Sequence, residues 1–272
     1  MARRVRLDRE LVRRRLARSR EHAVELIEAG RVTVRGNVAR KPATMVEPAE
    51  PVAVDPGDAD KQAGQEYVSR GGHKLAGALA AFAPLGLAVA RRRCLDAGAS
   101  TGGFTDVLLR AEAREVVAVD VGYGQLAWSL RTDPRVRVVD RTNVRALTAE
   151  AIGGQVELTV ADLSFISLRL ALPALAVCTA GAGDLVLMVK PQFEVGRGRV
   201  GSGGVVRDPR LRAEAVLGVA ETAGTMGLGV AGLAVSPLPG PAGNVEFFLW
   251  LRGGAPPADP REIARAVGEE VA

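Results

Sequence analysis

From Tyr67 to the C-terminus, apolar runs alternate with amphipathic segments, and this alternation limits the fold more than any other feature. Runs such as 115–121 and 184–190 lack alternating polar residues, as is typical of strands that a sheet buries on both faces. Helix-like segments such as 102–113 and 209–227 lie between them. This order predicts a doubly wound α/β sheet, with a ligand crevice at the carboxyl ends of its strands.

Two late strands predict how the sheet ends. They lie at 230–238 and 246–252, and a Pro/Gly-rich connection separates them, which predicts a closing β-hairpin. Such a hairpin is a feature of methyltransferase sheets rather than dehydrogenase sheets. We therefore expect a Rossmann-like class I methyltransferase sheet.

Basic residues are concentrated at the N-terminus. Residues 1–45 hold 13 Lys and Arg against 5 Asp and Glu, whereas the remaining chain holds 23 against 26. A basic head on a slightly acidic body indicates a nucleic-acid or other anionic partner. A solvated basic face explains the same composition equally well.

The cysteines and the apolar stretches indicate the compartment. Cys94 and Cys178 offer neither a disulfide framework nor a metal spacing. The N-terminus lacks the apolar core of a signal peptide, and the longest apolar stretch, 172–189, is broken by two glycines and an aspartate. We expect a cytoplasmic protein with no membrane contact, no metal and no obligate protein partner.

The composition also predicts two domains. Residues 56–66, "PGDADKQAGQE", are polar and show no periodicity. We place a small α+β domain at 1–60, a linker at 61–66 and the α/β domain at 67–272.

The head is predicted to contain two helices and a hairpin. The first helix runs over 7–17, Ser19 caps the second, and the hairpin turns at 35–37. With "RLD", "LARSREHAVELIEAGRVTVRG" and "KP", this order resembles the S4-type RNA-binding module. The resemblance implies phosphate contacts, which position an RNA without reading its sequence. The candidate residues are Arg4, Arg6, Arg18, Arg20, Arg31 and Lys41.

A glycine-rich loop, "LDAGASTGGFTDVLL", follows the first strand of the second domain. Glycines let the backbone approach a ligand, and Asp120 ends the next strand, where a carboxylate can accept both ribose hydroxyls. Ser100 stands where the dinucleotide pattern has its second glycine, so with the late hairpin the loop favours S-adenosylmethionine. The alternative for Asp96, Asp120 and Asn143 is a structural cap. The candidate cofactor residues are Asp96, Gly98, Ala99, Ser100, Thr101, Gly102, Gly103, Phe104, Asp120, Val121, Asp140, Asn143 and Asp162.

Four charged residues share the predicted carboxyl edge of the sheet. Asp162 and Lys190 follow neighbouring strands, Glu246 begins the last strand, and Lys74 lies just before the first helix of the domain. Each alone is typical of solvated surface charge, but four at one edge predict a site. Their order resembles the catalytic tetrad of the FtsJ-like ribose 2′-O-methyltransferases.

The chemistry of that reaction calls for a lysine. A ribose hydroxyl is a weak acid, so a base must take its proton as it attacks a methyl group. Free lysine, with a pKa of ~10.4, is protonated at neutral pH, but burial and a second cation favour the neutral amine. Lys190 is the candidate base and Lys74 the second cation, and Asp162 and Glu246 hold the two amines in position.

The glycine- and arginine-rich stretch 195–208 follows Lys190. We predict a mobile loop that closes over RNA, and a flexible connector is the alternative. The candidate RNA contacts of this domain are Arg70, Arg197, Arg199 and Arg207.

Long motifs in the second domain, among them "YVSRGGHKL", "VADLSFISL" and "VKPQFEVGRG", resemble the TlyA family. The resemblance implies S-adenosylmethionine-dependent 2′-O-methylation of cytidine in the 16S and 23S ribosomal RNA of 30S and 50S subunits. That family also carries a haemolysin label, so a membrane-acting protein is one rival function, against which the lack of a spanning segment argues. A catalytically inactive RNA-binding factor is the other, and only the intact tetrad and glycine loop oppose it.

Overall fold

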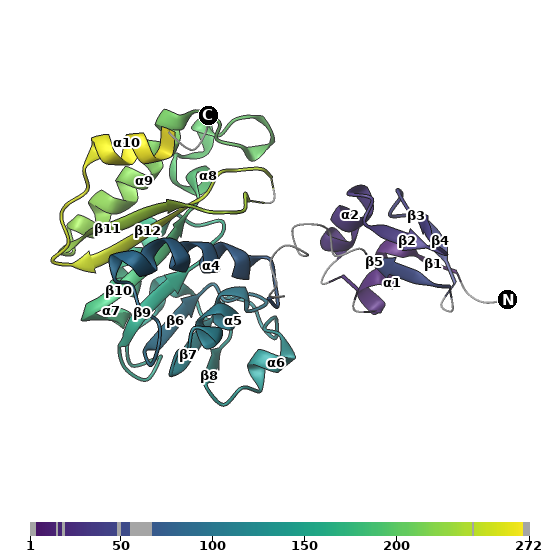
Figure 1. The fold of residues 1–272 in the computed structure, drawn as a ribbon, viewed down its shortest axis with the longest axis horizontal. Helices are drawn as coiled ribbons and strands as arrows, with labels where there is room; N and C mark the ends of the chain where they lie inside the picture. Colours follow the sequence, from purple (N-terminus) through teal and green to yellow (C-terminus); the bar gives the residue numbers. More distant parts are fainter. Residues whose placement is uncertain are drawn as a thin grey trace. The chain divides into compact units, whose positions relative to one another are not determined.

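The computed structural model describes residues 4–14, 16–17, 20–47, 50–54, 67–240 and 242–268. The chain divides into two compact units, Met1–Glu66 and Tyr67–Ala272 (Figure 1). Each unit has its own hydrophobic core. The linker predicted at 61–66 lies outside the described residues.

The N-terminal unit is a small α+β domain. Its helices bury Leu7, Leu11 and Ile27 completely. The hairpin turns at Arg35 and Gly36, whose φ angles of 52° and 80° suit the right-handed twist of the flanking strands. The elements are β1 (Val5–Arg6), α1 (Leu7–Arg13), α2 (Arg20–Glu28), β2 (Val32–Val34), β3 (Asn37–Val38), β4 (Met45–Val46) and β5 (Val52–Val54).

The first helix ends earlier than the sequence predicts. It stops at Arg13, not at Ala17. The backbone amides of Leu16 and Ala17 both donate to the carbonyl of Leu11, which reverses the chain and brings Ala17 into the core. The cap predicted at Ser19 lies outside the described residues.

A seven-stranded sheet with the order β11-β12-β10-β9-β6-β7-β8 forms the centre of the second unit. Strands β6 to β10 pair in parallel, and β12 runs antiparallel between β10 and β11. The doubly wound sheet and the closing hairpin are therefore confirmed. The strands are β6 (Arg93–Ala97), β7 (Glu115–Val119), β8 (Val136–Val139), β9 (Val156–Ala161), β10 (Thr179–Val189), β11 (Leu228–Val235) and β12 (Phe247–Gly253).

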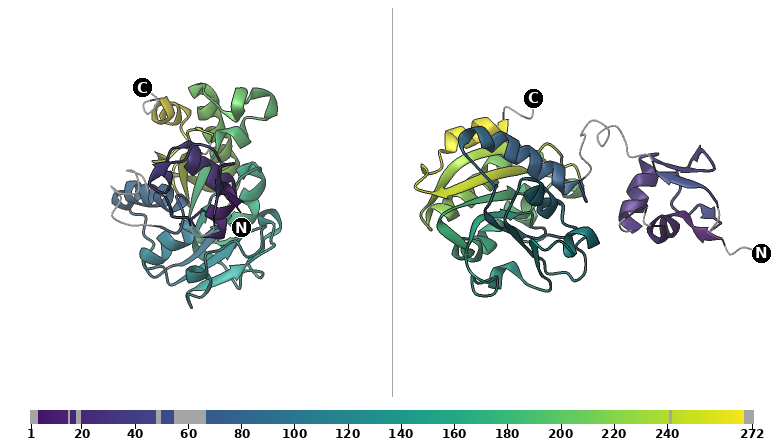
Figure 2. Two further views of the ribbon diagram at one scale, coloured as in Figure 1. Left: turned by 90° about the vertical axis from the view of Figure 1, so that its right-hand side faces the viewer. Right: turned by 60° about the horizontal axis from the view of Figure 1, so that its bottom comes forward.

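Helices cover both faces of this sheet (Figures 1 and 2). Because side chains alternate along a strand, β12 sends Leu249 into one core and Phe248 and Trp250 into the other. Helices α4, α5 and α6 cover the Phe248 side, and α7, α9 and α10 cover the Leu249 side. The helices are α4 (Gly71–Phe82), α5 (Gly103–Arg110), α6 (Trp128–Arg131), α7 (Leu168–Cys178), α8 (Pro191–Glu194), α9 (Pro209–Gly224) and α10 (Pro260–Gly268).

One strand in this unit is longer than the sequence predicts. The strand expected at 184–190 begins at Thr179, because α7 ends without a loop. Between β8 and β9 the chain forms a 3-10 turn at Val144–Ala146, followed by hydrogen-bonded turns. None of the helices in the described ranges has both the length and the hydropathy that a membrane span requires.

Candidate active site

The strand register brings the predicted edge residues together. Asp162 follows β9 and Lys190 follows the adjacent, parallel β10. Val189 of β10 lies opposite Phe247 of β12, so Lys190 emerges beside Glu246. The edge of the sheet thus carries two carboxylates and one amine within three neighbouring strands.

The Lys190 amine is held by two oxygen atoms. Its Nζ lies 2.5 Å from Oδ1 of Asp162 and donates to Oγ of Ser164 over 2.9 Å. Lys190 is only 8% exposed, whereas the Asp162 side chain is 25% exposed. The amine is therefore fixed in direction at the border between core and solvent.

The second pair is Lys74 and Glu246. Lys74 lies in the first turn of α4 rather than before that helix, which corrects the sequence-based placement. Its Nζ meets Oε2 of Glu246 at 2.5 Å, and both side chains are buried. A Cβ at Gly103 would lie 2.8 Å from the backbone nitrogen of Gly72, so glycine is what allows α4 to approach α5. This close approach brings Lys74 to the edge.

The glycine-rich loop crosses the edge beneath Asp162. Gly98, with φ of 86°, has no room for a Cβ, which would lie 2.6 Å from the carbonyl oxygen of Asp162. The Asp120 carboxylate accepts hydrogen bonds from the backbone nitrogens of Ser100 at 2.8 Å and Gly122 at 2.7 Å. Asp120 thus holds the loop closed, and each carboxylate oxygen keeps a lone pair for a further donor.

The remaining cofactor candidates divide by exposure. Ser100 and Val121 are exposed, Val121 at 74%, next to Asp120. The Phe104 ring instead lies in the core against Phe248, with ring centroids 6.0 Å apart. Asp140 accepts from Arg131, and the Asn143 side chain accepts from the amide of Arg145 as a helix cap, which was its alternative interpretation. Ala99, Gly102 and Gly103 are buried, and Thr101 is half-buried.

Asp96 is fully buried beneath the loop. Its Oδ2 accepts from the Thr105 hydroxyl at 2.6 Å, while Oδ1 has no hydrogen-bond partner among the described residues. Burial, reinforced by the nearby Asp162 and Asp120 carboxylates, raises the pKa of Asp96 to about 7. Its side chain therefore supports the loop from within the core.

Two residues that the sequence-based reasoning missed complete the rim of this site. Ser164 is the hydroxyl partner of Lys190 described above. Phe165 is 93% exposed and has a φ of 65°, and its ring lies 5.5 Å from that of Phe193. A bulky residue with positive φ is a true outlier. The signal in the sequence was a large aromatic residue three positions after Asp162, the polar residue that follows β9.

In the N-terminal unit, two of the predicted RNA contacts share one carboxylate. Asp8 is buried, and its Oδ2 lies 2.9 Å from Arg6 and 3.0 Å from Arg20. The hydrogen bond from Arg6 outweighs burial and, with that from Arg20, lowers the pKa of Asp8 to about 2. The two half-exposed guanidinium groups are thus held side by side.

The other RNA candidates are dispersed. Arg4 pairs with Glu47 at 3.4 Å, Lys41 is exposed, Arg31 lies between α2 and β2, and Arg18 is outside the described residues. In the second unit, Arg70 donates to the carbonyl of Pro239, and Arg199 pairs with Glu214. Arg207 donates to the carbonyl of Ser202 at 3.5 Å, and Arg197 lies in a 3-10 turn. Two hydrogen bonds attach stretch 195–208 to Asn244. The side-chain oxygen of Asn244 accepts from the amide of Val206, and its nitrogen donates to the carbonyl of Gly204.

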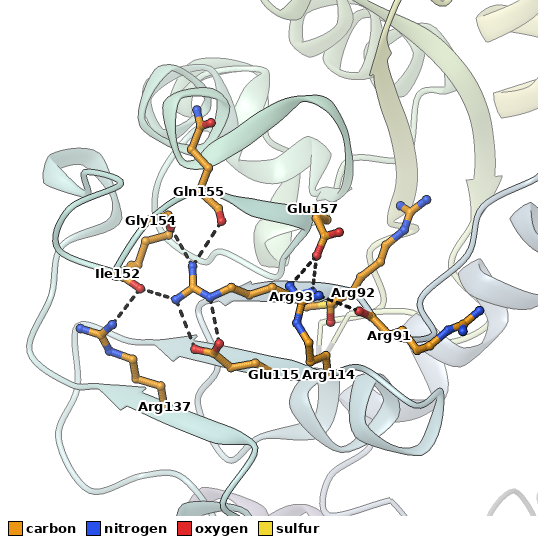
Figure 3. Close-up of polar contacts among 11 residues, drawn as sticks. Arg91, Arg92, Arg93, Arg114, Glu115, Arg137, Ile152, Gly154, Gln155 and Glu157 are labelled. Atoms are coloured by element: carbon orange, nitrogen blue, oxygen red, sulfur yellow. Dashed lines mark hydrogen bonds and ion pairs between the residues drawn. The ribbon is translucent and has the colours of Figure 1, made fainter.

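The opposite edge of the sheet is also rich in arginine, but those charges are used internally (Figure 3). Arg93 pairs with Glu115 and donates to the carbonyl of Ile152, while Arg114 pairs with Glu157. These contacts hold the starts of the strands together. At the carboxyl edge, by contrast, several residues of the candidate site are exposed.

Comparison with known proteins agrees with this division. The model of the FtsJ-like methyltransferase family matches residues 67–253, and that of the S4 domain matches residues 5–52. A Mycobacterium tuberculosis protein named 16S/23S rRNA (cytidine-2′-O)-methyltransferase TlyA is 62% identical over 93% of this chain and 91% of its own length. The chain belongs to the TlyA family of FtsJ-like methyltransferases.

Other proteins similar to this chain carry different names. A Bacillus subtilis protein named putative rRNA methyltransferase YqxC is 44% identical over 90% of this chain and 85% of its own. A solved structure named putative hemolysin from Streptococcus thermophilus superposes with a TM-score of 0.77 at 37% identity, covering 99% of this chain and 96% of that one. The fold and the family are therefore shared across these names.

Proposed function

We propose that the chain transfers a methyl group from S-adenosylmethionine to the 2′-hydroxyl of a cytidine in ribosomal RNA. Membership of the TlyA family supports the reaction class. The M. tuberculosis relative is named for 16S and 23S rRNA, and a Campylobacter jejuni relative, 34% identical over 68% of this chain, for 23S rRNA. We extend the 16S and 23S specificity, and with it a cytoplasmic site of action, from the former.

The observation that carries the proposal is the held amine of Lys190. In its neutral form this amine takes the proton of the 2′-hydroxyl as the hydroxyl oxygen attacks the methyl group. Asp162, 2.5 Å away, and Ser164 fix its direction, and alignment of the reacting atoms supplies much of the rate. Lys74, paired with the buried Glu246, adds the second cation of the site.

The residues around the glycine loop fit the cofactor. S-adenosylmethionine supplies an electrophilic methyl group when bound. Asp120 has spare acceptor capacity for ribose hydroxyls at the exposed end of β7, and the exposed side chain of Val121 offers an apolar surface for adenine. Asp96 contributes by supporting the loop rather than by touching the ligand, because it is completely buried.

Two features suit an RNA substrate. Arg6 and Arg20 present a paired positive surface for phosphates. The exposed ring of Phe165, next to Phe193, offers a face on which an unstacked base binds, as is usual for single-stranded RNA.

The test is methyl transfer to isolated 30S and 50S subunits with tritiated S-adenosylmethionine. We expect label that blocks alkaline cleavage of the RNA at specific cytidines. Lys190→Ala removes the base, and Lys190→Arg retains a long side chain with N–H donors opposite Asp162 but cannot accept a proton at neutral pH. Both variants should bind cofactor and transfer no methyl group.

Methyl transfer by Lys190→Arg would show that another residue is the base. No transfer by the wild-type chain to either subunit, with cofactor still bound, would overturn the enzyme proposal. The inactive RNA-binding factor would then be the better interpretation.

A further inference from the structure

The segment 162–168, which connects β9 to α7, is fastened along α8 at three points. Lys190 holds its beginning, Phe193 contacts its middle and Glu194 holds its end. The first two contacts belong to the site described above. The third has no part in the proposed reaction, although Glu194 is at least as buried as Lys190.

Both carboxylate oxygens of the buried Glu194 accept short hydrogen bonds. The residue is 6% exposed, accepts from the Ser167 hydroxyl at 2.6 Å through Oε2, and accepts from the Leu168 amide at 2.6 Å through Oε1. The Ser167 hydroxyl in turn accepts from the Arg169 amide at the start of α7. A carboxylate at this position satisfies amides that the helix leaves unpaired and complements the positive end of its dipole.

The middle of the segment is strained. Phe165 combines a φ of 65° with 93% exposure. Neither burial of its ring nor backbone preference explains this conformation, because a phenylalanine avoids the left-handed region. Such a residue keeps its conformation only where the surrounding structure determines it. Contacts at both ends of the segment provide that determination.

We propose that Glu194 is a positioning residue that acts through Phe165. By fixing the end of the segment, it keeps the Phe165 ring against Phe193, directly after Ser164, which binds the Lys190 amine. In this position the ring receives the base of the substrate nucleotide. Glu194 touches neither substrate nor cofactor. This inference rests on the proposed function.

A double-mutant cycle tests the coupling. Single-turnover methylation of unmethylated ribosomal subunits is measured for the wild type, Glu194→Ala, Phe165→Ala and the double variant. We expect each single change to lower kcat/KM for the subunits about 10- to 100-fold, as a misplaced binding group does. If Glu194 acts through Phe165, the double variant will lie within about 3-fold of Phe165→Ala. Losses that multiply would overturn the proposal.

Three controls keep the outcome clear. Glu157→Ala removes a glutamate at the opposite edge, where it pairs with Arg114 and accepts from the backbone amide of Arg93. It should change kcat/KM less than about 2-fold, because it lies at the other end of the strands from the site and distant sites act independently. Cofactor affinity should be unchanged in the Glu194 variants, and a loss of affinity that accounts for the kinetic defect would contradict the inference. If Glu194→Ala does not fold, Glu194→Gln, which keeps the size and one acceptor, replaces it in the cycle.

The cycle also separates the two proposals. A wild-type chain that transfers no methyl group would overturn the proposed function and this inference together. An active wild type with multiplying losses would overturn the role of Glu194 alone.

Discussion

Replacing Asp96 by asparagine should change how the stability of the second unit depends on pH. The unfolded chain gives up this proton near 3.8, but the native state keeps it until about 7. Between these values the native state binds one proton more, so the free energy of unfolding falls as pH rises. Below 3.8 the contribution is complete, and above about 7 it is lost. Asparagine stays neutral, so the variant lacks this fall.

The size of the effect follows from the shift. About two pH units separate pH 5 from the native pKa of Asp96, and each unit corresponds to ~1.36 kcal/mol. The free energy of unfolding of Asp96→Asn, measured relative to that of the wild type, should therefore rise by about 3 kcal/mol between pH 5 and pH 8. Any fixed cost of fitting the amide, or pH dependence of other groups, cancels in this difference.

Urea unfolding at pH 5, 6, 7 and 8, followed by tryptophan fluorescence, measures this difference. Both tryptophans, Trp128 and Trp250, lie in the second unit, so the signal reports on that unit. A difference between variant and wild type that stays constant from pH 5 to pH 8 would refute the reasoning, because the carboxyl group would then already be ionised in the native state at pH 5.

Asp184→Asn is the matched control. Asp184 is also completely buried, but it accepts from Trp250 at 2.7 Å and from Arg252 and Arg92. Burial alone would raise its pKa, yet these three donors together lower it. Its stabilising contribution is thus present above pH 3.8 and is lost only at lower pH. The variant should be destabilised by an amount that does not change between pH 5 and pH 8.

Four further outcomes are expected. Asp120→Ala should weaken S-adenosylmethionine binding about 10- to 100-fold by calorimetry, because it removes a ligand contact and leaves the amides of Ser100 and Gly122 without their acceptor. Gly103→Ala should lower the free energy of unfolding by about 1–3 kcal/mol, because its Cβ would lie 2.8 Å from the Gly72 nitrogen; Gly218→Ala, with 3.7 Å of room in α9, should raise it by up to ~1 kcal/mol. Arg20→Ala should reduce the slope of log affinity for RNA against log salt concentration by about one. An unchanged slope would show that Arg20 does not contact a phosphate.

The central sheet could be predicted because its strands are buried on both faces. Runs such as 184–190 are then almost uniformly apolar, and a charged residue that follows them marks the edge. The late hairpin was equally clear from its Pro/Gly connection. Lys190 and Asp162 were found in this way, since neighbouring parallel strands end at the same edge.

What the sequence could not reveal depends on contacts between distant segments. The helix from Leu7 ends early because two later amides return to the Leu11 carbonyl. The burial of Asp96 and the ring packing of Phe104 depend on the helices that cover them. The left-handed backbone of Phe165 has no local cause, because contacts on either side of it impose the conformation.

The strand order also determines when during synthesis this protein can become competent. β12 is made last among the strands but lies between β10 and β11, so one flank of β10 stays open until β12 has left the ribosome. That interval covers roughly 70 residues, or about 4–14 s at bacterial elongation rates. The Lys74–Glu246 pair joins the first helix of the unit to the start of that last strand. A nascent chain, or one shortened before Glu246, therefore leaves Lys74 without its buried carboxylate partner, so the edge of the sheet is completed only when the last strand joins it.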